Sequence, residues 1–189
     1  TTLQSERESL AQADVEDNIE TVRACGGTVL FGVDATRLKT PEAVGRRKGF
    51  DRIIFNFPLV SGGLPKDTPS ATSANQALLR EIFGNTAAGG LLCPDGELHV
   101  TIPRGQPYEQ WGLPTLAKLA GLRVKCAIPF DAAAYPGYRS DIPHINGGAL
   151  TYALVKVGTR AVPTEEVKKR FGGSAKEMNK QRRKKPRKP

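Results

Sequence analysis

The sequence has few of the side chains from which metal centres and disulfide frameworks are built. Its 189 residues include only two histidines and three cysteines. His99 and His144 lie far apart, and Cys25, Cys93 and Cys126 form no Cys-x-x-Cys pair. Because a structural zinc site takes about four clustered cysteine or histidine ligands, we expect no metal site. We interpret the cysteines as reduced, mostly buried residues of an intracellular protein.

Long apolar runs are also absent from the sequence. No window approaches the roughly eighteen apolar residues that a membrane-spanning helix requires, and no signal peptide stands at the start. Hydrophobic residues make up 39% and charged residues 25% of the chain, which is typical of a soluble globular domain. We therefore expect no membrane partner. Since the sequence begins at Thr1, we also expect an upstream piece to be missing.

Positive charge is concentrated at the end of the chain. Lys and Arg number 28 and Asp and Glu number 19, which gives a net charge of +9. Residues 159–189 hold 12 basic and 3 acidic residues and account for all of this charge, whereas residues 1–158 carry 16 of each sign. We predict a folded domain over 1–158 and a basic tail over 159–189 that is disordered or an isolated helix. Such a tail indicates an anionic partner.

Apolar periodicity and turn residues predict alternating helices and strands. Helices are expected to begin at Ser5 and to cover 14–25, 73–86 and 113–120. Strands are expected over 28–33, 52–57, 97–102, 122–128 and 149–157, with loops over 39–49 and 129–148 and a turn over 94–96. Because no helix separates the last two strands, we expect them to form an antiparallel edge pair in a mostly parallel α/β sheet. This pattern is typical of Rossmann-like class I methyltransferases.

Asp34 directly follows the strand expected over 28–33. Ligands of open α/β sheets bind at the carboxyl ends of the strands, where a carboxylate can accept a hydrogen bond from a ribose hydroxyl or an adenine amino group. The alternative is that Asp34 only caps the next turn.

Asn56, Phe57 and Pro58 form an unusual turn after the next expected strand. Pro58 fixes the backbone, Asn56 can present an amide to a planar nitrogenous ring, and Phe57 can stack on that ring. The turn resembles the Asn-Pro-Pro-aromatic turn of nucleic-acid methyltransferases that act on amino groups. The alternative is a strand-end turn with a buried phenylalanine.

Two further groups of residues are candidates for catalysis or binding. Glu97, His99 and Thr101 alternate onto one face of their expected strand, so His99 is either a general base or a satisfied, partly buried histidine. Tyr135 and Tyr138 flank a Pro-Gly pair in the long loop. They can stack unpaired bases of RNA or anchor the loop onto the domain.

Five segments, in order along the chain, resemble the signature of the large-subunit rRNA uridine-N3 methyltransferase family. They are residues 32–36, 50–58, 75–79, 95–101 and 135–138, and the resemblance covers about residues 1–140. It implies a Rossmann-like methyltransferase fold, S-adenosylmethionine as methyl donor, and rRNA or a pre-ribosomal particle as partner. It also implies a nucleolar or nuclear location, with the mitochondrion as the alternative.

The resemblance also assigns the donor site. The family's glycine-rich loop, which approaches the methionine part of the donor, would precede Thr1. We therefore expect the first strand of the sheet to lie outside this chain and the chain alone to bind the donor weakly. The family's acidic residue for the ribose hydroxyls aligns with Gln4, and Asp34 and Ala35 would contact the adenosine.

The leading hypothesis is a methyltransferase that modifies a uracil ring nitrogen of rRNA during ribosome formation. Asn56, Phe57 and Pro58 would form the catalytic turn, and the target base would first leave its stack. The residues expected to bind RNA are Tyr135, Tyr138, Arg182, Arg183, Lys184, Lys185, Arg187 and Lys188.

Two alternatives to the enzyme stay open. One is a catalytically inactive ribosome assembly factor or ribosomal protein that keeps the methyltransferase fold and binds rRNA. The other is a general RNA-binding module that works through its basic tail alone. The tail also suits a nuclear or nucleolar targeting signal.

Overall fold

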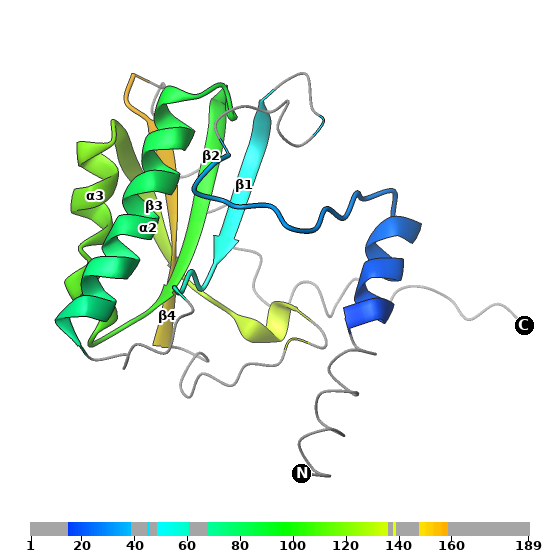
Figure 1. Cartoon of the computed structure of the whole chain (residues 1–189), viewed down its shortest axis with the longest axis horizontal. Helices are drawn as coiled ribbons and strands as arrows, with labels where there is room; N and C mark the ends of the chain where they lie inside the picture. The colour runs from blue at the N-terminus through cyan, green and yellow to red at the C-terminus, as the bar shows by residue number, and fades with distance from the viewer. Residues whose placement is uncertain are drawn as a thin grey trace, which may run out of the picture. The chain divides into compact units, whose positions relative to one another are not determined.

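The computed structural model describes residues 15–38, 45, 49–60, 68–135, 138 and 148–158 (Figure 1). The chain divides into two compact units, Thr1–Ala35 and Thr36–Pro189. The described part of the first unit is a helix over 15–24 followed by irregular chain, in agreement with the helix expected over 14–25. The helix expected from Ser5 and the tail over 159–189 lie outside the described residues.

The second unit is built on a four-stranded sheet (Figure 1). Its strands are β1 (Phe50–Asn56), β2 (Leu92–Pro103), β3 (Leu122–Pro129) and β4 (Ala149–Lys156), in the spatial order β1-β2-β4-β3. β1 pairs parallel with β2, and β4 pairs antiparallel with both β2 and β3. Three strands therefore run in one direction and β4 runs in the other. The expected α/β fold and its antiparallel edge pair are confirmed.

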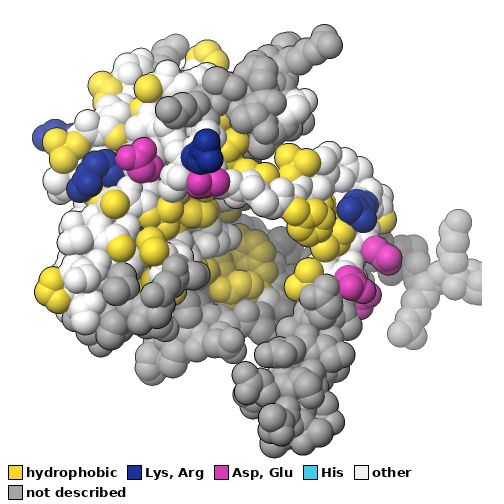
Figure 2. All heavy atoms as spheres, in the orientation of Figure 1, with side chains coloured by type: hydrophobic (Ala, Val, Ile, Leu, Met, Phe, Trp, Pro, Cys, Tyr) yellow, Lys and Arg dark blue, Asp and Glu magenta, His cyan; other side chains and the backbone are white. Residues whose placement is uncertain are grey.

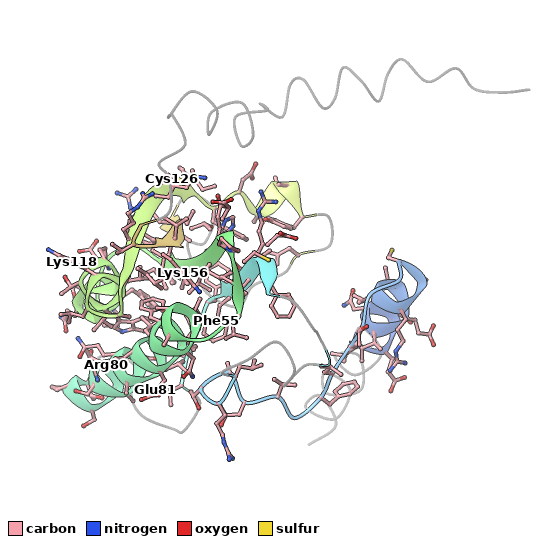
Figure 3. The ribbon with its side chains drawn as sticks, turned by 90° about the horizontal axis from the view of Figure 1, so that it is seen from above. Phe55, Arg80, Glu81, Lys118, Cys126 and Lys156 are labelled. Atoms are coloured by element: carbon pink, nitrogen blue, oxygen red, sulfur yellow. The ribbon has the colours of Figure 1, made fainter. Side chains whose placement is uncertain are left out.

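Two helices lie against one face of the sheet (Figures 1 and 3). Helix α2 (Pro69–Ala88) connects β1 to β2, and helix α3 (Leu113–Leu119) connects β2 to β3. Helix α2 begins four residues earlier than expected, because the Thr68 side chain accepts a hydrogen bond from the backbone of Ala71 at 3.2 Å and Pro69 fits the first helical turn.

The two faces of β2 differ in polarity. Since successive side chains of a strand point to opposite faces, Leu98 and Val100 lie on one face and Glu97, His99 and Thr101 on the other. The apolar face packs with Leu79 and Phe83 of α2 in the buried core. Figure 3 shows Phe55 on the side of the helices and Cys126 on the opposite side. The Glu97 face is buried as well, although it is polar.

The strand expected over 28–33 is not formed. These residues are irregular, and Leu30, Phe31 and Val33 are 50%, 71% and 46% exposed. The expectation was wrong because β-branched and apolar residues supply only a preference for extended chain. A strand also needs a partner for its backbone hydrogen bonds, and no strand pairs with this segment in the described chain.

The turn expected over 94–96 lies inside β2. The pairing register jumps from Phe50 with Leu92 to Arg52 with Glu97, so the ladder absorbs the extra residues of β2 as an irregularity. Gly96 makes this possible, because a Cβ atom there would stand 2.7 Å from the carbonyl oxygen of Phe50. The strand therefore begins five residues earlier than expected.

The three cysteines differ in how far they are buried. All three cysteines are free thiols, but Cys25 is exposed and Cys93 and Cys126 are half-buried, so the expected burial was wrong for Cys25. Within the described ranges, no group of three or more His, Cys, Asp or Glu side chains is placed to hold a metal ion. None of the described helices is long and apolar enough to span a bilayer.

Leu79 and Leu119 offer a matched test of the core. Leu79 of α2 is 0% exposed and Leu119 of α3 is 78% exposed. We expect Leu79→Ala to lower the free energy of unfolding by about 2–5 kcal/mol, because it leaves a cavity. Leu119→Ala should change it by less than about 0.5 kcal/mol. Urea denaturation measures both, and equal effects would contradict the assigned core.

Candidate functional site

Asn56 ends β1 and is joined by hydrogen bonds to two other strands. The Thr101 hydroxyl of β2 donates to Asn56 Oδ1 at 2.7 Å, and the hydroxyls of Thr101 and Thr151 of β4 lie 2.9 Å apart. Thr101 is buried, whereas Asn56 is exposed. The amide of Asn56 is therefore held from the inside and open to solvent on its other side.

Phe57, the next residue, has a backbone conformation that residues other than glycine rarely adopt. Its φ is 51°, the one positive value among the described residues other than glycine. The following proline, Pro58, further narrows the conformations open to it. Strain of this kind costs about 1–3 kcal/mol and persists where surrounding contacts impose it. Here the Phe57 N–H donates to the Thr101 carbonyl at 2.8 Å, and Pro58 is buried.

Asn75 of α2 fastens the chain that leaves this turn. Its Oδ1 accepts from the Val60 N–H at 2.9 Å, and its Nδ2 donates to the Ala71 carbonyl at 2.8 Å. The side chain is buried, so the two bonds fix the segment after Pro58 against α2.

An aromatic cluster, formed by Phe57, Phe130, Tyr135 and Tyr138, lies beside the turn. Phe130 meets Phe57 edge to face with ring centroids 5.2 Å apart, and it stacks on Tyr135 at 5.5 Å. Tyr138 lies 5.5 Å from Phe130 and 6.3 Å from Phe57. Phe130 is buried, while Tyr135 and Tyr138 are 55% and 39% exposed. Two segments far apart in the sequence therefore meet in one place.

The chemistry available at this place is recognition of a flat, polar ring. Exposed tyrosines next to an exposed amide can stack on such a ring and hydrogen-bond to its edge, as single-stranded RNA bases require. Neither Asn56 nor an aromatic ring of the cluster is a base at neutral pH, so the described side chains at the turn orient a ligand and do not remove its proton.

Three of the residues that hold this site were not among the expected site residues. They are Thr151, Phe130 and Asn75, of which only Asn75 belongs to one of the five family-like segments. The alternation of β4 carries a signal for Thr151, and Phe130 stands directly after β3. Their contacts with Thr101 and Phe57 depend on strand order and register, which local sequence does not reveal.

His99 belongs to a buried ionic network. Its Nε2 lies 2.8 Å from Glu97 Oε2, and Lys125 Nζ donates to Glu97 Oε1 at 2.6 Å. Arg52 Nε lies 3.9 Å from the same carboxylate. These contacts favour the interpretation of His99 as a satisfied histidine, since Glu97 occupies its Nε2.

The network sets the ionisation of two side chains. Burial alone raises the pKa of Glu97, but hydrogen bonds and charge from Lys125 and His99 outweigh it and hold the pKa below its ordinary value of 4.5. Burial raises the pKa of the Cys126 thiol, and the charge of Lys125 does not offset this. Cys126 is therefore a protonated thiol at neutral pH and a poor nucleophile.

Of the residues expected to hold the donor, the structure describes Asp34 and Ala35. Asp34 and Ala35 belong to the first unit and follow irregular chain instead of a strand. Gln4 lies outside the described residues, as do Arg182, Arg183, Lys184, Lys185, Arg187 and Lys188. The two described donor residues thus belong to the unit Thr1–Ala35, and the sheet belongs to the unit Thr36–Pro189.

Glu97 gives a prediction about acid stability. A carboxyl whose pKa is lowered by folding stabilises the fold above its unfolded value, and this is lost as the pH falls through the folded value. We expect the free energy of unfolding to decrease below about pH 4.5 in part through Glu97. Glu97→Gln should remove that part and cost about 3–5 kcal/mol at neutral pH, because Lys125 loses its partner.

The control for this prediction is Glu81→Gln on the exposed side of α2 (Figure 3). It should leave both the stability and its pH dependence unchanged. Urea denaturation between pH 3 and pH 7 measures both variants. A Glu97→Gln protein with the stability of the wild type at neutral pH would contradict the importance of the network.

Comparisons with known proteins agree with the resemblance seen in the sequence. A family model described as rRNA (uridine-N3-)-methyltransferase BMT5-like matches residues 1–141. The mouse ferredoxin-fold anticodon-binding domain-containing protein 1 homolog is 32% identical over 171 residues, which cover 82% of this chain and 25% of that protein. The Arabidopsis thaliana heavy metal-associated isoprenylated plant protein 41 is 32% identical over 143 residues, covering 71% and 27%. The chain spans about a quarter of the length of these two curated relatives.

Among solved structures, the chain is similar to a putative DNA modification methylase from Thermus thermophilus in complex with S-adenosyl-L-methionine. The TM-score is 0.43 at 13% identity, over 72% of this chain and 58% of that one. The family match covers well over half of the sequence. The chain therefore belongs to the BMT5-like rRNA (uridine-N3-)-methyltransferase family.

Proposed function

We propose that the protein methylates N3 of a uridine in large-subunit rRNA during ribosome formation, and that the target base binds at Asn56, Phe57 and Pro58. Family membership supplies the class of reaction. The position of the site is supported by one observation: the strained turn with its exposed Asn56 meets Tyr135 and Tyr138 in one aromatic cluster. Local strain that surrounding contacts maintain is common at functional sites.

The described residues would act on the acceptor base. A uracil that has left its stack would lie against the aromatic cluster, and Asn56 would hydrogen-bond to its edge. S-adenosylmethionine supplies the methyl group when it is bound. The N3 proton must leave before N3 can accept that group. Asn56 cannot take this proton, and the Nε2 of His99 is engaged with Glu97, so water is the acceptor that we propose.

The tail would supply affinity for the rRNA or the pre-ribosomal particle. Residues 1–158 are neutral and residues 159–189 carry the whole net charge of +9. On the face shown in Figure 2, the described basic side chains lie singly or beside acidic ones. Because a basic tail also suits a nuclear or nucleolar targeting signal, we propose a nucleolar or nuclear location, with the mitochondrion as the alternative.

A second candidate function is that of a catalytically inactive ribosome assembly factor that keeps the methyltransferase fold and binds rRNA. It is favoured by the irregular chain that precedes Asp34 and Ala35, where a strand was expected. Under this alternative, a change at Asn56 would leave ribosome assembly intact. The catalytic proposal predicts instead that the change lowers the rate of methylation, which makes Asn56 the residue to change first.

Asn56→Ala should lower the methylation rate by about 10² to 10³, because loss of one positioned polar contact to a reacting group costs about 2–4 kcal/mol in the transition state. The exposed side chain should contribute no more than about 1 kcal/mol to folding. The assay uses the natural full-length protein with an rRNA fragment and labelled donor, alongside thermal melts.

Asn85→Ala is the matched control for Asn56→Ala. Asn85 is half-buried near the C-terminal end of α2 and donates to the Thr36 carbonyl. It has no contact with the turn among the described interactions, so its removal should not change the methylation rate. Wild-type methylation by a folded Asn56→Ala protein would exclude this turn as the site of the reaction.

Removal of residues 159–189 should weaken the dependence of RNA affinity on salt. If about six of the 12 basic side chains contact phosphates, the slope of log affinity against log salt is about −4 to −5. We expect the truncated protein to lose most of that slope in titrations at two or more salt concentrations. An unchanged slope would show that the tail does not bind RNA.

A further inference from the structure

The side chain of Asn56 offers two chemically different groups to a ligand. The carbonyl oxygen of an asparagine amide accepts hydrogen bonds, and its NH₂ group donates two. If the protein binds the carbonyl oxygen, the NH₂ group is left to face the ligand, and if it binds the NH₂ group, the carbonyl oxygen is left. This inference rests on the proposed function, because it takes the Asn56 turn as the place where the target base binds.

Thr101 uses the carbonyl side of this amide. Its hydroxyl donates to Asn56 Oδ1 at 2.7 Å, and a hydroxyl has a single hydrogen to give. In the 2.9 Å contact between Thr101 and Thr151, Thr151 must then be the donor. Thr101 is only 1% exposed, so water does not compete for its hydroxyl.

The sheet register holds the three residues of this chain of hydrogen bonds in line. Asn56 of β1 is the partner of Thr101 in the parallel ladder, and Thr101 is the partner of Thr151 in the antiparallel ladder. The backbone adds a further bond, since the Phe57 N–H donates to the Thr101 carbonyl. The orientation of the Asn56 amide is thus fixed by three strands and does not need a ligand.

We propose that Thr101 and Thr151 set the base specificity of the site, by turning the NH₂ group of Asn56 toward the ligand. Uracil carries a carbonyl oxygen at C4, beside N3, and this oxygen accepts a hydrogen bond from such a donor. Cytosine keeps the carbonyl at C2 but carries an amino group at C4, so the NH₂ group of Asn56 at that position would face a second donor. The site therefore selects a base with a carbonyl at C4 and disfavours a base with an amino group there.

Asn56→Asp tests this assignment without removing the contact with Thr101. A carboxylate accepts from the Thr101 hydroxyl as the amide oxygen does, but it has no N–H to give. It would therefore present an acceptor to the base. We expect the preference to shift from uracil toward cytosine by about tenfold or more, since correct hydrogen bonding to a base edge discriminates by about 1–3 kcal/mol.

Thr101→Val and Thr101→Ser separate a positioning role from a structural one. Valine matches the shape of threonine but has no hydroxyl, so Asn56 is free to turn and the preference should disappear. Serine keeps the hydroxyl and should keep the preference. A merely structural role of Thr101 would change the melting temperature and leave the preference as it is.

The measurement is the ratio of the dissociation constants of labelled decauridine and decacytidine, with the natural full-length protein. Contacts of the tail to phosphates affect both probes alike, and differences in stacking cancel when the ratios of the variants are compared with that of the wild type. Unchanged ratios in both Asn56→Asp and Thr101→Val would overturn the inference.

The same experiment keeps this inference apart from the proposed function. Binding of the two probes needs neither methyl donor nor turnover. If the ratio shifts in Asn56→Asp while the wild type methylates no rRNA fragment, the specificity inference holds and the catalytic proposal fails. If the wild type methylates uridine and the ratio stays constant in both variants, the catalytic proposal holds and the specificity inference fails.

Discussion

The hydrogen bonds around Thr101 join the three strands that build the site. The carbonyl of Thr101 accepts from Phe57 and its hydroxyl donates to Asn56, while the Thr151 hydroxyl approaches from β4. A left-handed phenylalanine before a proline is unfavourable by itself. The turn keeps this form because buried Thr101 binds the backbone N–H of Phe57 through its carbonyl and the side-chain amide of Asn56 through its hydroxyl.

Other residues around the turn hold its outgoing chain and its aromatic ring. Asn75 holds the outgoing chain against α2, and Phe130 carries Tyr135 and Tyr138 to the ring of Phe57. On the same polar face of β2, Glu97 binds Lys125 and His99. Buried charges are tolerated only when they are paired, so the contacts of Glu97 with Lys125 and His99 stabilise the polar face of β2.

The sequence predicted the parts of the fold that depend on local pattern. The apolar runs gave all four strands of the sheet, and the missing helix before β4 gave the antiparallel pair. The run over 28–33 has the same composition as a strand but is irregular, because strand formation depends on a partner elsewhere. Contacts between site residues also depend on partners elsewhere in the chain. Asn56, Phe57, Tyr135 and Tyr138 could therefore be proposed individually, but their contacts with one another could not. The bond from Thr101 to Asn56 requires the register of β1 and β2.

Crosslinking would test most directly whether the target base binds at the turn. The natural full-length protein would be irradiated with a large-subunit rRNA fragment that carries 4-thiouridine in place of uridine, and the crosslinked peptides would be identified by mass spectrometry. Binding of the base beside the aromatic cluster predicts crosslinks in the peptides that contain Phe57 or Tyr138. Crosslinks confined to residues 159–189 would contradict it, because the RNA would then be held by the tail alone.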